Sequence, residues 1–147
     1  MRSMLGITIA APAERIFALA ADVERWPLLL PHYRYVRRLP SRNGERRFAM
    51  GARRGPIPVR WEATQRPLPE EGVIEFSHTG GVTRGMQVAW RLVACDGGTQ
   101  VSIEHRLDLG WPLLGRFAAE RVIGPYVVDA IAGRTLRCMK QLAEQDR

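Results

Sequence analysis

The sequence has little cysteine and none of the short motifs that mark the common chemistries. Its two cysteines, Cys95 and Cys138, stand far apart and form no Cys-x-x-Cys pair. We therefore expect two small buried thiols, with no disulfide framework. The three histidines, His32, His78 and His105, are also scattered, and no metal site is predicted. A Gly-x-Ser-x-Gly element, a P-loop and a dinucleotide fingerprint are all missing. Nucleophilic catalysis, phosphoryl transfer and a cofactor are accordingly not expected.

Long apolar runs are missing as well. No stretch approaches the roughly 18–20 apolar residues that a membrane span needs. The start, Met1 to Gly6, lacks the apolar region and small-residue cleavage site of a secretory signal. We therefore expect a cytoplasmic protein. The chain of 147 residues suits one domain, residues 1–147, and its 46% hydrophobic and 25% charged residues are typical of a globular chain.

Lysine is almost absent, because Lys140 is the only one among 22 basic residues, which face 15 acidic ones for a net charge of +7. Such a balance is compatible with nucleic-acid binding. The arginines, however, alternate with apolar residues along strand-like segments. This pattern favours the solvated outer face of a sheet over a nucleic-acid site, with arginine favoured by genome composition or thermal adaptation.

The order of predicted elements indicates an α+β fold. A strand over 5–10 leads into a helix that Pro12 starts, and a second short helix follows around Val23–Trp26, which Pro27 and Pro31 prevent from running on. From Tyr33 to about residue 109 the apolar residues alternate, and turns at 41–44, 54–56, 68–72, 80–81 and 96–98 divide this region into six antiparallel strands.

The last segment returns to helical spacing. A helix of some thirty residues is predicted from Pro112 onward, with a kink at Gly124-Pro125. Its apolar stripe consists of Phe117, Val127, Val128, Ile131, Thr135, Cys138 and Leu142. We expect this helix to lie against the concave side of a curved sheet of about seven strands.

This order resembles the helix-grip fold of START and Bet v 1-like (SRPBCC) proteins. The opening Ala-Pro-Ala-Glu-Arg-Ile-Phe, Asp-Val-Glu-Arg-Trp-Pro and Pro-His-Tyr is similar to that of polyketide cyclase/dehydrases and coenzyme-Q-binding proteins, and residues 127–136 resemble the helix of the latter group. The cyclase resemblance implies cavity aromatics, which Trp26, Tyr33, Trp61 and Trp90 match in this chain.

The same resemblance implies arginines inside the cavity, and here the sequence departs from it. Gln65 stands at one expected position, with Arg66 on the other face of the strand, and Ser77 and His78 stand at the second. These departures weaken a cyclase assignment. They favour a cavity that binds a hydrophobic molecule.

Strand alternation, together with the last helix, predicts which side chains line that cavity. For each apolar member, plain core packing is the alternative. The predicted lining comprises Trp26, Tyr33, Tyr35, Phe48, Met50, Trp61, Ala63, Gln65, Phe76, His78, Met86, Val88, Trp90, Ile103, His105, Phe117, Val127 and Ile131.

No catalytic residue is assigned, but His105, Tyr33 and Gln65 are the candidates, with His78 a further inward histidine. The alternative for each is a hydrogen-bonded core group, since no orienting carboxylate is visible in the sequence. The segment 109–117 is predicted either as an entrance that touches a membrane or as a packed helix turn.

Three functions follow, in descending order of preference. The first is binding or transport of a hydrophobic molecule such as a lipid, an isoprenoid quinone or a polyketide. The second is cyclisation and dehydration of an aromatic polyketide, which would make the chain an enzyme. The third is a basic interaction module that contacts RNA or the ribosome. The oligomeric state and the ligand's identity stay open.

Overall fold

A computed structural model describes residues 2–81, 83–107 and 127–145. Strand β1 (Arg2–Ile9) is followed by helix α1 (Ala13–Ala21), the 3₁₀ turn η1 (Val23–Arg25) and the short helix α2 (Trp26–Leu29). Six strands then follow, interrupted by the 3₁₀ turn η2 (Pro69–Glu71), and the described chain ends in helix α4 (Ala130–Gln145). The six strands are β2 (Tyr33–Arg42), β3 (Glu45–Arg54), β4 (Ile57–Leu68), β5 (Val73–Gly81), β6 (Gln87–Cys95) and β7 (Gly98–Arg106).

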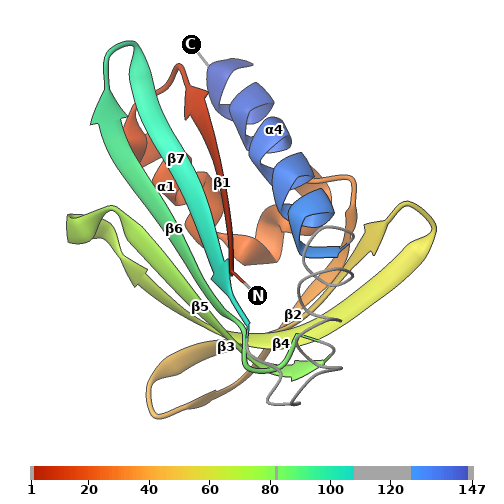
Figure 1. The fold of residues 1–147 in the computed structure, drawn as a ribbon. Helices are drawn as coiled ribbons and strands as arrows, with labels where there is room; N and C mark the ends of the chain where they lie inside the picture. The colour runs from red at the N-terminus through yellow and green to blue at the C-terminus, as the bar shows by residue number, and fades with distance from the viewer. Residues whose placement is uncertain (1, 82, 108–126, 146–147) are drawn as a thin grey trace.

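The seven strands form one antiparallel sheet in the order β1-β7-β6-β5-β4-β3-β2. Strands that are consecutive in the chain pair with one another from β2 through β7, and β1 pairs with β7. The chain between β1 and β2 therefore crosses from one edge of the sheet to the other, and α1 and α2 lie on that crossing. In Figure 1 the sheet curves, and α4 runs along its concave side. This arrangement is the helix-grip fold, as predicted.

Most strand connections lie where the sequence predicts turns, but the turn expected at 80–81 is wrong, because both glycines belong to β5 and the connection to β6 follows them. At the β2–β3 turn, Asn43 and Gly44 have φ of 56° and 75°, the positive values that a two-residue turn of this kind requires. At the β3–β4 turn, Gly55 has φ of 59° and is followed by Pro56. The predicted hairpin pattern is thus confirmed at both places.

Two boundaries and the burial of one cysteine differ from the sequence prediction. β1 begins at Arg2, before the expected residue 5, because its pairing with β7 extends from Arg2 opposite Arg106 to Ile9 opposite Thr99. Near the last helix, residues 127–129 form a wider π-type turn before α4. The rest of that predicted helix and the predicted entrance segment lie outside the described residues. Cys95 is exposed at the end of β6 rather than buried, whereas Cys138 is half-buried, and both are free.

The core fills the space between the concave face and the helices. The most deeply buried side chains include Ile9, Ile16, Leu30, Phe48 and Met139. They come from the sheet, α1, the α2–β2 connection and α4, so all of these layers share one core. Among the described residues, no helix is long and apolar enough to cross a membrane. The described part of the chain also shows no cluster of metal-ligating side chains.

Candidate functional site

A cavity of about 80 Å³ lies between the concave face of the sheet and the first turns of α4. Its walls come from α2, from strands β2 to β7 and from the start of α4, so elements from most of the described chain meet there. The lining consists of Trp26, Tyr33, Met50, Val59, Trp61, Phe76, His78, Thr83, Met86, Val88, Trp90, Ile103, His105, Val127, Val128, Ile131, Ala132 and Thr135.

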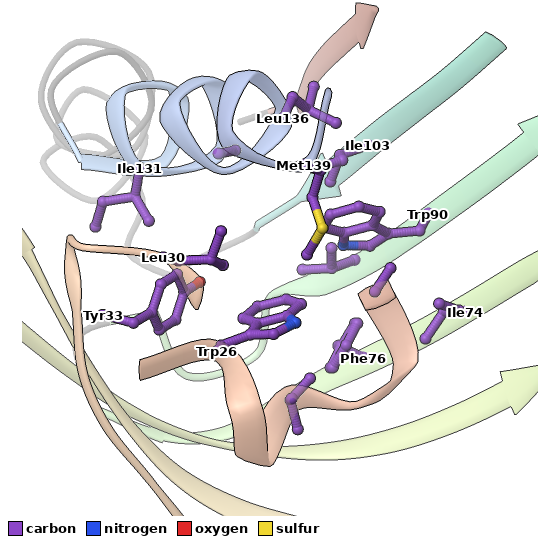
Figure 2. Packing of buried hydrophobic residues seen from close by; sticks show 14 of the residues in the cluster. Trp26, Leu30, Tyr33, Ile74, Phe76, Trp90, Ile103, Ile131, Leu136 and Met139 are labelled. Atoms are coloured by element: carbon purple, nitrogen blue, oxygen red, sulfur yellow. The ribbon is translucent and has the colours of Figure 1, made fainter. Parts of the chain in front are cut away.

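An arc of aromatic rings forms one wall of this cavity. Trp26 lies 5.0 Å from Tyr33 and 5.9 Å from Trp90, between ring centroids, and Tyr33 lies 6.0 Å from Trp61. These separations and edge-on or tilted angles are those at which aromatic pairs attract. Figure 2 shows Trp26 near the middle of this group, with Phe76 beside it and α4 beyond. The arc offers flat apolar surface to a ligand with rings of its own.

The backbone of α1 fixes Trp26 in this arc. Its indole N–H donates to the carbonyl of Leu19 at 3.1 Å, so the polar edge of the ring is satisfied and only its apolar body is left to contact a ligand. Pro27 follows directly and sits in the first turn of α2, where its missing N–H costs no hydrogen bond. The Trp-Pro pair therefore sets both the start of α2 and the position of the ring.

His78 is the first of two histidines on the cavity wall. Its Nδ1 lies 2.7 Å from the Thr83 hydroxyl, and its ring stacks on Trp61 with 3° between the planes. Burial lowers the pKa of His78 to about 3, and repulsion from His105 adds to this effect. The imidazole is therefore neutral at pH 7, and it is held in place on one face and at one nitrogen.

His105 is the second, and it is less constrained. It stands on β7 between Val88 of β6 and Ser3 of β1. Its Nδ1 is buried and has no hydrogen-bond partner among the described residues. Burial lowers the pKa of His105 to about 4, although the Asp129 carboxylate acts in the opposite direction. A buried nitrogen without a partner is costly unless a ligand or a water completes it.

Asp129 joins this end of the cavity from the turn before α4. It accepts a hydrogen bond from the Ser3 hydroxyl, and Ser3 is the residue opposite His105 in the sheet. The structure thus supplies the carboxylate near His105 that the sequence pattern does not reveal. The spacing along the chain gives no signal for it, since 126 positions separate Ser3 from Asp129.

A third polar group closes the cavity on the α4 side. The Thr135 hydroxyl donates to the carbonyl of Ile131 at 2.8 Å and lies 2.8 Å from Nε2 of His32. Because its one proton is used on Ile131, Thr135 accepts from His32, whose Nε2 must carry the hydrogen. Burial lowers the pKa of His32 to about 4. Burial also raises the pKa of Tyr33 well above its usual range, which keeps the phenol protonated.

The structure places thirteen of the eighteen predicted lining residues around the cavity; their contact with a ligand stays a prediction. Of the other five, Phe117 lies outside the described residues. The prediction that Tyr35 lines the cavity is wrong, because a bulge between Tyr33 and Tyr35 breaks the alternation of side chains along β2. Tyr35 then pairs with Gly51, and its ring packs over that glycine on the outer face of the sheet. Only glycine fits there, since a Cβ at position 51 would lie 2.3 Å from the ring.

The remaining three, Phe48, Ala63 and Gln65, face inward but do not line the cavity. Phe48 packs at the α1 end of the sheet, where the Arg38 guanidinium lies over its ring. Ala63 is buried, and its methyl group is too short to reach the cavity. Gln65 donates from Nε2 to the carbonyl of Ala21 at 2.8 Å, tying α1 to β4. Gln65 therefore does not fit the role of a catalytic candidate, because its side chain lies outside the cavity lining and bonds to the backbone of α1.

Several lining residues were not predicted as part of the site. Val128, Ala132 and Thr135 follow the helical spacing of the last apolar stripe, which could have identified them. Val59 shares the alternation of Trp61. Thr83 lies in the β5–β6 connection, where no periodicity applies. Arginine is absent from the described lining, and Arg66 points outward to Glu75, as predicted.

Comparison with known proteins agrees with this architecture. Residues 9–124 match the family model for polyketide cyclase/dehydrase and lipid transport. The granaticin polyketide synthase bifunctional cyclase/dehydratase of Streptomyces violaceoruber is 30% identical over 111 residues, which are 74% of this chain and 34% of that protein. The chain thus spans about a third of the length of this curated relative.

Solved structures with the same fold include the Zhui aromatase/cyclase of Streptomyces sp. R1128, with a TM-score of 0.81 at 18% identity over 99% of this chain and 94% of that one. A START superfamily protein of Mycobacterium smegmatis has a TM-score of 0.70 at 16% identity, covering 98% and 97% of the two chains. At such identities the likeness speaks for the fold alone. The match to the family model covers most of the sequence, and the chain therefore belongs to the polyketide cyclase/dehydrase and lipid transport family.

Proposed function

We propose that the chain binds a flat hydrophobic molecule carrying a hydroxyl or carbonyl group, of the aromatic polyketide class, in the cavity under α4. The observation that carries this proposal is that Nδ1 of His105 has no partner among the described residues and lies on a cavity wall that is otherwise mostly aromatic and aliphatic. A few placed polar groups in an apolar pocket are what orients a small ligand. The kinship with a cyclase/dehydratase of polyketide synthesis supports the ligand class.

The size of the cavity limits what fits without rearrangement. A volume of about 80 Å³ is well below the roughly 300–1,000 Å³ of pockets for drug-sized ligands. A ligand with one or two rings is the better match. We expect a larger one to displace wall side chains, and Met50 and Met86 are the ones best able to move, because methionine is unbranched and adaptable.

A second candidate function is cyclisation with dehydration, and the placement of His105 near Asp129 favours it. In such a reaction an imidazole nitrogen takes a proton from a carbon that lies between two carbonyls. The resulting enolate attacks another carbonyl further along the polyketide to form the carbon–carbon bond. The proton returns to the new alkoxide. Loss of that hydroxyl with a neighbouring proton then releases one water.

The protonation state of the histidines ranks binding above catalysis. A general base works best with a pKa near the operating pH, whereas the pKa of His105 is lowered to about 4 and that of His78 to about 3. Both are poor bases at pH 7 but good neutral hydrogen-bond partners. Incubation with a poly-β-ketone separates the two functions. A change of product that His105→Leu abolishes would favour the enzyme.

The binding proposal is tested by titrating the protein with 2-naphthol and with naphthalene, followed by quenching of tryptophan fluorescence. We expect both to bind and 2-naphthol to bind more tightly, because it alone can hydrogen-bond to His105. Ala132→Phe should abolish binding, since Ala132 lines the cavity and the added ring fills it. Gln141→Phe, on the exposed side of α4, is the matched control. Equal binding by the two variants would contradict the proposal.

A further inference from the structure

The excess of positive over negative charge lies in one part of the chain. The segment 33–60, which spans β2, β3 and the start of β4, contains nine arginines and a single acidic residue, Glu45. The rest of the chain contains thirteen basic and fourteen acidic residues. The net charge of +7 is therefore entirely due to this segment, and the remainder of the protein is close to neutral.

Some arginines of the sheet form ion pairs with described residues and others do not. On the half that contains β1 and β7, Arg2 and Arg106 both pair with Glu104, and Arg66 pairs with Glu75 between β4 and β5. On the half that contains β2 and β3, Arg38 pairs with Glu24, but Arg34, Arg53 and Arg60 are exposed and make no ion pair with any residue that the structure describes. These three guanidinium groups belong to neighbouring positions of β2, β3 and β4, near the β3–β4 turn.

The β3–β4 turn itself is apolar. Ile57 is 55% exposed there, between Pro56 and Pro58. The two prolines have no N–H to lose from water, so moving this turn into a less polar medium costs fewer unsatisfied donors than an ordinary hairpin turn. In Figure 1 the turn is the yellow loop at the right edge of the view, at an outer corner of the molecule.

This turn is connected to the cavity along one strand. Ile57, Val59 and Trp61 alternate on β4 and so point to the same face of the sheet. Val59 and Trp61 line the cavity. A continuous apolar row therefore runs from an exposed turn, flanked by cations, to the wall of the proposed binding site.

We propose that the β3–β4 turn docks this protein onto an anionic lipid bilayer, with Ile57 entering the interface and Arg53 and Arg60 binding lipid headgroups. Apolar side chains flanked by basic ones are what hold proteins in the plane of a bilayer surface. Each basic residue near such a surface contributes to binding, and the attraction falls off within a Debye length. The remaining arginines of segment 33–60 add to the attraction at longer range.

The apolar turn favours a bilayer over the other anionic partners. Phosphates of RNA or carboxylates of an acidic protein would use the arginines but would leave Ile57 without a role. Binding to a bilayer uses both, and it does not depend on whether the cavity accepts a ligand. This inference therefore goes beyond the proposed function, and the two can fail independently.

Flotation of the ligand-free protein with lipid vesicles tests the proposal. Vesicles of phosphatidylcholine with phosphatidylserine should bind the protein, and vesicles of phosphatidylcholine alone should bind it weakly. The double substitution of Arg53→Gln and Arg60→Gln should lower the partition coefficient about 30-fold. Ile57→Ser should lower it ~10-fold. Circular dichroism of each variant verifies that the fold is intact, which is expected for exposed positions.

Two matched controls share the chemistry but not the location. The first control, Arg66→Gln with Arg91→Gln, removes two exposed arginines that lie on β4 and β6 outside segment 33–60. The second, Val93→Ser, removes an apolar side chain that is 61% exposed on β6. Both should retain vesicle binding. Equal losses in controls and test variants would overturn the proposal, because net charge or general apolarity would then suffice. Retention on RNA that Ile57→Ser leaves unchanged, without any vesicle binding, would also overturn it and favour a nucleic-acid partner.

Discussion

The core of this protein contains two sets of buried polar side chains, and they differ in their hydrogen-bond partners and in whether they line the cavity. His32 and Gln65 bind helices: His32 reaches Thr135 on α4, and Gln65 reaches the carbonyl of Ala21 at the end of α1. His78 and His105 stand on strands and line the cavity; His78 bonds to Thr83, and Nδ1 of His105 has no partner within the described part of the chain. The first set holds the helices against the sheet, whereas the second is available to a ligand. Residue type alone would not separate His32 from His105.

Among single substitutions, the largest effect should come from removing a helix contact. His32→Ala should lower the free energy of unfolding by about 3 kcal/mol, because it loses a buried hydrogen bond and leaves a void. Urea unfolding measures this. Thr135→Val removes the partner of the same bond, so the two changes together should cost less than the sum of the single costs. Strict additivity would show that the His32–Thr135 bond does not matter.

Acid should destabilise the protein through all three histidines. Their pKa values in the folded state are lowered to about 4, 3 and 4 from 6.5. Between pH 6.5 and 4, the unfolded chain therefore binds more protons than the folded chain does. Stability is full above pH 6.5 and decreases as the pH falls toward 4, by ~1.4 kcal/mol per pH unit for each histidine involved. Unfolding midpoints at a series of pH values measure the slope, and His105→Leu should make it shallower. A flat profile would mean that the histidines are not buried as described.

A ligand contact should respond in the opposite way to a helix contact. His105→Leu should weaken binding of 2-naphthol about ten-fold, the size of one lost hydrogen bond, and leave naphthalene unaffected. The stability should hold or rise, because a buried nitrogen without a partner is replaced by an apolar group of similar size. Calorimetric titration and urea unfolding of the same sample give both values. A loss of stability like that of His32→Ala would place His105 with the structural set.

The smallest effect concerns Gln65. Gln65→Met should cost about 1 kcal/mol, the net value of its bond to the Ala21 carbonyl, and should leave the affinity for 2-naphthol unchanged. Gln141→Met, at an exposed position on α4, serves as the control for both measurements. Weaker ligand binding by the Gln65 variant alone would return this residue to the site, as the sequence pattern had suggested.

The sequence was sufficient for the fold and for most of the cavity wall. Alternation along β4 to β7 identifies Trp61, Phe76, Trp90 and His105 as inward residues, because the strand period is two wherever the pairing is regular. It failed at Tyr35, where a bulge reverses the direction of the side chain. Period-based reasoning assumes regular pairing and cannot see an inserted residue.

The polar partners in the site could not be predicted for a different reason. Asp129 near His105 and Thr135 beside His32 are set by tertiary packing, whereas Thr83 beside His78 is set by the irregular β5–β6 connection, to which no periodicity applies. Thr135 lies 103 positions after His32, and Asp129 lies 126 positions after Ser3, its hydrogen-bond partner, so no local pattern links them. Alternation predicts that His105 points inward, but the partners available to its Nδ1 among the described residues are known only once β1, β6 and α4 are placed around it.

The central claim is that His105 is the cavity group that a ligand completes, whereas His32 is a structural group. Nitrogen-15 NMR of the histidine side chains during titration with 2-naphthol tests it most directly. The account predicts that the Nδ1 resonance of His105 moves in proportion to the bound fraction while those of His32 stay in place. A His105 resonance that is unchanged at saturation, or a His32 resonance that shifts equally, would contradict it.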